Sequence, residues 1–380
     1  MVQKIFTRDF LFIFLAQLTL SSVYCILIPT FPIYLSKKGS TEVEIGILVG
    51  TLSLSSLVFR PFVGRALLRI SERTFMVAGA LLFALTSMGY FFALTFWPLL
   101  TVRIFQGIGA AFFYTAAVTL VAHISPEARL GQSISSYYLG FNIAFALTPT
   151  FGMFLIDSFG FNVLFAVCTG LSLCSLFVMT RLKERHVHPS DPSPPEESPI
   201  LSRKALPPAI VAFLSAMTWG ALSAFFPLYA LDHGMANPGL FFTVYAMMII
   251  LGRVLGGRVL DIYPRESVLL PCLAAGIIAM GILPFSKSLF MFLVVAAICG
   301  IGHAFLYPAL VAYTLGLTRP SRGPAIGTYS AFEDFGTGIG PVIIGIILRF
   351  TSYPIMFVCL VLAGIINLNY FYFFIKKKAT

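Results

Sequence analysis

Charged residues are scarce in this chain of 380 residues. Asp, Glu, Lys and Arg together make up 11% of it, whereas soluble domains contain about a quarter, and the mean hydropathy is +0.92. Apolar runs of about 20 residues recur, which is the length of helix that crosses about 30 Å of hydrocarbon. The strands of a membrane barrel would be about half as long. We therefore expect an all-α polytopic membrane protein.

The sequence also lacks the motifs of metal sites and of membrane enzymes. Its six cysteines lie in apolar runs without CxxC spacing, so we expect neither a disulfide framework nor a metal site. H-E-x-x-H, G-x-S-x-G and the phosphate-binding G-x-x-x-x-G-K-[ST] are all absent. These absences argue against an enzyme and against a nucleotide cofactor. A polytopic membrane enzyme remains the alternative from a different functional class.

The apolar runs predict twelve transmembrane helices. The loops between them are short, except for residues 182–205, where charge, Pro and Ser concentrate. We interpret this segment as a cytoplasmic linker between two six-helix halves, residues 1–181 and 206–380. The predicted spans are 9–35, 44–68, 74–94, 97–123, 130–156, 161–181, 206–231, 238–262, 267–286, 288–317, 324–349 and 353–375.

Most basic residues fall on one side of these spans, among them Lys4, Arg8, Arg129, Arg203 and Lys376. The positive-inside rule places this side, with both termini and the linker, in the cytoplasm. The net charge of +10 has the same explanation, so we expect no nucleic-acid partner. The first apolar run continues past the length of a signal peptide, which indicates a first membrane span. We expect a monomer in the lipid bilayer.

The two halves repeat each other. GIGAAFFYTA from Gly107 recurs as GIGHAFLYPA from Gly300, 193 residues later, and the segments from Arg60 and Arg253 match with the same offset. Since six spans return the chain to its starting side, the halves are expected to be parallel repeats. Such repeats place a substrate site between them near the membrane midplane.

With these repeated segments, the sequence resembles the major facilitator superfamily over nearly the whole chain. RIFQGIGAA, from Arg103, resembles the helix 4 motif of its proton-coupled members. RPFVGRALLRISER, from Arg60, resembles the loop motif between helices 2 and 3, with Leu68 at the usual Asp position. The gating residues that the loop motif implies are Arg60, Gly64 and Arg65, with Gly257, Arg258, Asp261 and Arg265 in the second copy.

The helix-bend motif of antiporters is only partial in helix 5, at Pro149 and Gly152, and is fuller in helix 11, at Gly340 and Pro341. The combined motifs look most like bacterial drug and metabolite efflux members of the superfamily, including exporters of metal-chelating compounds. The resemblance implies alternating access in the bacterial inner membrane, with helices 1, 4, 7 and 10 lining the cavity.

Arg103 is the one cation deep in the fourth span. Helical spacing places Arg103, Gln106, Gly107 and Tyr114 on one face. An intramembrane charge usually has a function, so we expect this face to line a cavity. A structural arginine bonded to a neighbouring helix is the alternative.

Two acids, Glu333 and Asp334, lie deep in the eleventh span. They point about 100° apart on a helix, so they are expected to have different roles. A carboxyl that moves between wet and dry surroundings can load and release protons, and we favour Asp334 for this role. The alternative is a permanent structural bridge with Arg103 or another group.

Other polar residues at helical spacing complete the predicted site. His303 is a candidate proton relay, although a neutral hydrogen-bonding histidine is the alternative. The expected cavity residues are Gln17, Ser21, Tyr24, Gln106, Tyr114, Trp219, Ser223 and Tyr307. Ser and Gln also hold helices together, so the individual assignments compete with packing.

The sequence therefore predicts a secondary transporter that exports a small organic molecule in exchange for protons. A proton-coupled importer of the same fold is the alternative, because the partial helix 5 motif weakens the argument for antiport. The expected partners are a small-molecule substrate, protons and lipid.

Overall fold

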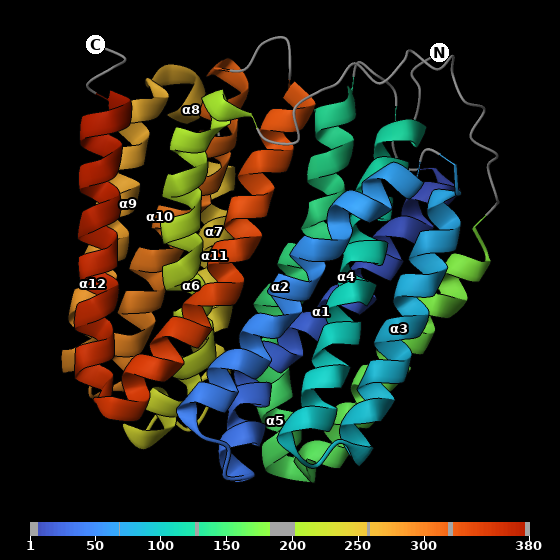
Figure 1. The fold of residues 1–380 in the computed structure, drawn as a ribbon, viewed down its shortest axis with the longest axis horizontal. Helices are drawn as coiled ribbons and strands as arrows, with labels where there is room; N and C mark the ends of the chain where they lie inside the picture. The colour runs from blue at the N-terminus through green and yellow to red at the C-terminus, as the bar shows by residue number, and fades with distance from the viewer. Residues whose placement is uncertain are drawn as a thin grey trace. The chain divides into compact units, whose positions relative to one another are not determined.

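The computed structural model describes residues 7–67, 69–125, 129–182, 202–256, 259–317 and 322–376. Within these ranges the chain is helical, and no strand is assigned. Figure 1 shows the helices, which are α1 (Arg8–Lys37), α2 (Glu42–Ala66), α3 (Glu72–Phe92), α4 (Phe96–Ile124), α5 (Leu130–Thr180), α6 (Leu206–Asp232), α7 (Gly239–Leu255), α8 (Val259–Ile262), α9 (Arg265–Ile282), α10 (Leu289–Leu317), α11 (Arg322–Phe350) and α12 (Tyr353–Tyr370).

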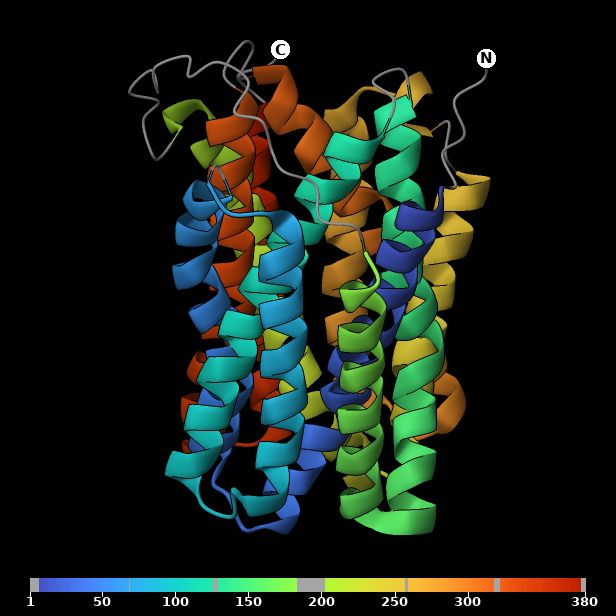
Figure 2. The same cartoon turned by 90° about the vertical axis from the view of Figure 1, so that its right-hand side faces the viewer.

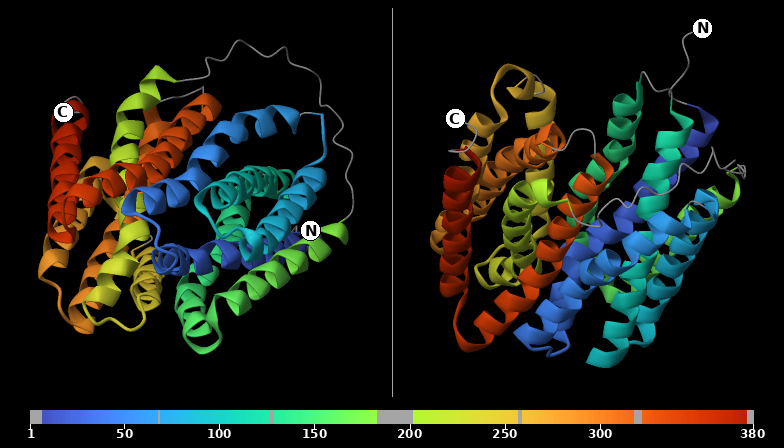
Figure 3. Two further views of the ribbon diagram at one scale, coloured as in Figure 1. Left: turned by 60° about the horizontal axis from the view of Figure 1, so that its bottom comes forward. Right: turned by 45° about the horizontal axis from the view of Figure 1, so that its top comes forward.

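Ten helices of the described chain are long and apolar enough to cross a membrane, and α7 is a shorter apolar helix. The long α5 contains two predicted spans, because Gly160 breaks the helical geometry with φ of 80°. Only glycine adopts such a φ at little cost. The two legs of α5 lie side by side (Figure 2 and Figure 3), so the helices are compatible with twelve spans.

The predicted eighth span, 238–262, is wrong as one continuous helix. The structure has α7, which ends at Leu255, and a separate four-residue helix, α8. Gly256 is the C-terminal cap of α7, and its backbone N–H donates to the Gly252 carbonyl oxygen. Most of the predicted linker, residues 183–201, lies outside the described residues.

The chain divides into two compact units. Unit 1 comprises Met1–Tyr34 and Thr51–Ser193, and unit 2 comprises Leu35–Gly50 and Pro194–Thr380. In unit 1, α3 packs against α4 and α5, around fully buried rings that include Phe31, Phe83 and Phe113. In unit 2, α10 packs against α7 and α9, and α6 packs along α11.

The repeated Gly-Ile-Gly step has the same packing role in each unit. A Cβ on Gly107 would meet the Leu52 backbone of α2, and a Cβ on Gly300 would lie 2.5 Å from the Tyr245 carbonyl oxygen of α7. The second glycine of each step faces a different helix, since Gly109 lies against α3 and Gly302 against α9. These glycines let α4 and α10 each pack closely on two neighbours.

Candidate functional site

Arg103 lies inside unit 1, with only 6% of its surface exposed. Its NH1 donates a hydrogen bond of 2.8 Å to Oε1 of Gln106 and a longer one of 3.5 Å to the Tyr90 hydroxyl. The guanidinium carbon lies 4.4 Å from the ring centre of Phe31. Cations over aromatic faces are attracted by the ring quadrupole, by about 2 kcal/mol when desolvated. The charge is therefore held by α1, α3 and α4 of one unit.

Gln106 links this network. Its Oε1 also accepts a hydrogen bond of 2.7 Å from the Tyr90 hydroxyl, so two donors converge on the oxygen and fix the orientation of the amide. The predicted shared face of Arg103 and Gln106 is confirmed by their hydrogen bond. Phe31 and Tyr90 were not predicted as partners. Phe31 begins the segment FPIYL, which recurs in the second half as FPLYA from Phe226. This repeat was the one sequence feature that singled out Phe31.

The polar stripe on α1 lies against α4 and α5. Gln17 and Ser21 are fully buried, and the Tyr137 hydroxyl donates a hydrogen bond of 2.5 Å to Oε1 of Gln17. Tyr114 on α4 is half-buried, and its hydroxyl neighbours the Ser21 hydroxyl. Tyr24 packs its ring 6.3 Å from that of Phe141. The structure therefore brings four predicted cavity residues, Gln17, Ser21, Tyr24 and Tyr114, into one region of unit 1.

The two acids of α11 are both half-buried. Glu333 interacts electrostatically with Tyr307 of α10 and with Tyr329 one turn earlier on α11. The Thr337 hydroxyl donates to the Glu333 backbone oxygen at 3.0 Å, a contact within the helix. The protonation of a carboxyl depends on how well water reaches it. Asp334 is the next residue on α11 and points about 100° away from Glu333.

Aromatic rings from three helices of unit 2 gather around His303. The His303 ring stacks on Tyr307 with centres 5.5 Å apart, and their four-residue spacing places both on one face of α10. Trp219 of α6 stacks on Tyr245 of α7 at 4.5 Å, and its ring centre lies 6.0 Å from that of His303. Tyr245 was not predicted as a site residue.

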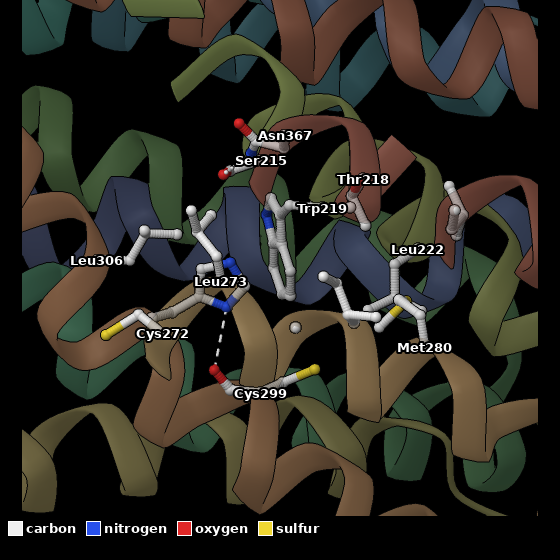
Figure 4. Close-up of a pocket in the computed structure, with 15 residues that line it drawn as sticks. Ser215, Thr218, Trp219, Leu222, Cys272, Leu273, Met280, Cys299, Leu306 and Asn367 are labelled. Carbon is white, nitrogen blue, oxygen red and sulfur yellow. Dashed lines mark hydrogen bonds between the residues drawn. The ribbon is translucent and has the colours of Figure 1, made fainter. Parts of the chain in front are cut away.

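A small cavity of about 50 Å³ lies beside this aromatic cluster, among α6, α9, α10 and α12 (Figure 4). Trp219 and His303 line it together with Ser215 and Asn367. Such a volume holds a few water molecules.

Two hydrogen bonds orient the polar side chains of this lining. His303 Nδ1 lies 3.1 Å from the Cys299 carbonyl oxygen, and because a carbonyl oxygen only accepts, Nδ1 carries the hydrogen and donates it. Asn367 donates to Ser215 Oγ at 2.9 Å.

The remaining predicted site residues have varied surroundings. Ser223 donates to the Gly220 carbonyl of its own helix at 2.7 Å. Arg60 Nε donates to Ser56 Oγ at 3.3 Å, whereas Gly64 and Arg65 are exposed. In the second copy, Asp261 lies in α8 and Arg265 begins α9. Leu68, Gly257 and Arg258 lie outside the described residues.

The helix-bend residues lie within long helices. Pro149 lies inside α5 and Pro341 inside α11. A Cβ on Gly152 would lie 3.1 Å from Ile26 of α1, and Gly340 lies against the Met217 backbone of α6. In the described residues no group of three or more His, Cys, Asp or Glu side chains is arranged to hold a metal ion.

The Major Facilitator Superfamily model matches residues 12–241 and 209–380. The chain belongs to this superfamily. It is therefore a membrane transporter rather than an enzyme, and it acts on small-molecule substrates.

Two relatives of this superfamily member are named for export or resistance. The chain is 24% identical to the Staphylopine export protein of Staphylococcus aureus strain Mu50, covering 92% of this chain and 91% of the relative. It is 21% identical to Quinolone resistance protein NorA of S. aureus strain MSSA476, covering 84% of each.

Solved transporters share the fold. The nucleoside transporter NupG matches with a TM-score of 0.78 over 96% of this chain and 98% of that chain, at 12% identity. A bacterial homologue of the human lysosomal transporter Spinster, in an inward-facing conformation, matches with a TM-score of 0.73 over 96% and 95% of the two chains, at 15% identity.

Proposed function

We propose that this transporter exports a small organic molecule, such as a drug, a metabolite or a metal-chelating compound, in exchange for protons. The observation that carries the proposal is the Glu333–Asp334 pair, half-buried near the middle of α11. Ionisable carboxyls in a membrane span are costly, and those that occur usually have a function. The names of two relatives, an export protein and a drug-resistance protein, support the outward direction.

Proton exchange requires a group that takes up and releases protons in step with substrate. Asp334 is our first choice, because its repeat counterpart Asn142 is polar. Glu333, which interacts electrostatically with Tyr307, is the second. Arg103 and His303 would contribute as a fixed cation and as a proton relay. The cell membrane of a bacterium, with both termini in the cytoplasm and a monomeric chain, is the proposed setting.

Metabolite profiling tests the direction and finds the substrate. Media from cells with and without the gene are compared, and compounds enriched by the gene are then offered to inside-out vesicles with an acid interior. An exporter that exchanges protons accumulates the compound, and collapse of the pH gradient stops the accumulation. Depletion from the medium of intact cells would instead favour the importer that the partial helix 5 motif leaves open.

A further inference from the structure

The end of α12 carries aromatic side chains on its surface. The chain continues from α12 into a short π-helix, η4 (Phe371–Lys376). The Phe371 ring is fully buried in the core of unit 2, which fixes η4 on the bundle. The next three rings are each about half exposed, namely those of Tyr372, Phe373 and Phe374. Lipid covers exposed rings in a membrane protein, and tyrosine in particular is enriched at the level of the lipid head groups.

Two exposed cations, Arg203 and Lys204, lie at the same end of unit 2. They belong to η2 (Arg203–Ala205), a turn that leads into α6, and α6 begins where α12 ends (Figure 1). Asn367 of α12 donates a hydrogen bond of 3.1 Å to the Val211 carbonyl oxygen of α6. Lys204 lies seven residues before Val211, and Phe374 lies seven residues after Asn367. At about 1.5 Å per residue, both lie about 10 Å beyond this hydrogen bond, at the same level.

Positive charge dominates this end of the unit. Lys376 ends η4, and Lys377 and Lys378 follow it in the sequence. Arg265 begins α9, which contacts η4, and the acid Glu266 beside it offsets that one charge. The positive-inside rule explains the sign of these charges. It does not explain why two basic segments far apart in the sequence meet beside a band of exposed rings. A ligand with an anionic head and an apolar tail fits both features.

We propose that η2 and η4 form a docking surface for an anionic phospholipid. The phosphate of the head group accepts charge-assisted hydrogen bonds from Arg203 and Lys204, and the acyl chains lie along the exposed rings of η4. Each Lys or Arg beside an anionic bilayer surface raises the affinity about fivefold. The inference goes beyond the proposed transport reaction, since it depends neither on the direction of transport nor on protons.

The test titrates purified full-length protein in neutral detergent with phosphatidylglycerol or with phosphatidylcholine of the same acyl chains. The rise in Tm with lipid content gives an apparent Kd for each lipid. We expect the wild type to bind phosphatidylglycerol more tightly, and high salt to remove this preference by screening. The double variant Arg203→Gln, Lys204→Gln is expected to weaken phosphatidylglycerol binding about 25-fold, with about fivefold for each charge removed, and to leave phosphatidylcholine binding unchanged. Because both side chains are exposed, these substitutions leave the core intact.

Lys37 and Lys38 give a matched control at the other end of unit 2, and both are exposed. The Ser202 N–H, next to η2, donates to Thr328 Oγ1 near the start of α11. Gly345, near the end of α11, lies against the start of α2, which follows the two lysines. These contacts are seventeen residues apart on α11, about 25 Å of helix. The double variant Lys37→Gln, Lys38→Gln removes the same number of charges and is expected to keep the preference for phosphatidylglycerol.

Three results overturn the docking surface. Equal Kd values of the wild type for the two lipids show that the charge of the head group is not recognised. A preference that survives in the Arg203→Gln, Lys204→Gln variant, or that the Lys37→Gln, Lys38→Gln variant loses to the same extent, places the charge effect elsewhere. Inorganic phosphate is the last control, since a rise in Tm that matches the rise with phosphatidylglycerol indicates a site for a free anion rather than for lipid.

Discussion

Gln106 accepts a hydrogen bond of 2.8 Å from the Arg103 guanidinium, three residues before it on α4. The same oxygen accepts from Tyr90, so one buried amide connects α4 to α3 and holds a cation inside the helix bundle. This arrangement makes Gln106 the residue on which the local network depends.

Gln106→Leu is expected to destabilise the protein more than Tyr90→Phe does. Leucine leaves both the Arg103 guanidinium and the Tyr90 hydroxyl without their shared acceptor, at a cost of about 1–3 kcal/mol for each unsatisfied group and more for the charged one. Phenylalanine at position 90 keeps the ring contact with Phe165 and loses only the hydrogen bond of the hydroxyl, which contributes about 1 kcal/mol to stability. Thermal unfolding followed by size-exclusion chromatography measures both. Equal Tm values for the two variants would contradict this account.

Arg103→Ala is expected to disable transport while the protein still reaches the membrane. The change removes the α4 cation that contacts the Phe31 ring of α1 and the Tyr90 hydroxyl of α3. Transport into vesicles is compared at matched protein levels. Rates close to those of the wild type would assign Arg103 a structural role only.

Gly300→Val is expected to lower the Tm by several degrees, because a Cβ at this position already lies 2.5 Å from the Tyr245 carbonyl oxygen. Overpacking of this kind costs about 1–3 kcal/mol or more. Gly170→Ala is the control, since nothing lies within 4 Å of its Cβ position, and alanine in a helix gains about 0.5–1 kcal/mol. Similar Tm values for the two variants would show that α7 and α10 do not pack as described.

His303→Phe tests the proton relay. Phenylalanine can keep the stacking on Tyr307 but has no nitrogen that binds a proton. We expect gradient-driven transport to fall at least about tenfold, while exchange of substrate without a gradient continues. Unchanged gradient-driven transport would make His303 a neutral member of the aromatic cluster.

The sequence predicts the elements of this fold better than their contacts. The apolar run 97–123 matches α4 (Phe96–Ile124) closely, because membrane spans are set by length and hydropathy. The repeat correctly pairs Gly107 with Gly300. The eighth span was predicted as continuous because hydropathy does not register a break at Gly256.

The contacts within the candidate site follow from packing between helices. Tyr137 lies 120 residues from Gln17 along the chain, and Tyr90 lies in an apolar run with no polar spacing of its own. Helical periodicity relates residues within one helix. It therefore predicted that Arg103 shares a helix face with Gln106 and that His303 shares one with Tyr307, but it gave no partner on another helix.

The most direct test of the central claim is transport into inside-out vesicles that contain the wild type, Asp334→Asn or Glu333→Gln, with the compound found by metabolite profiling. An acid interior should drive accumulation by the wild type, and Asp334→Asn should abolish it while gradient-independent exchange and folding persist. Glu333→Gln is expected to retain part of the driven transport. Driven accumulation that is unchanged in both variants would contradict proton coupling through α11.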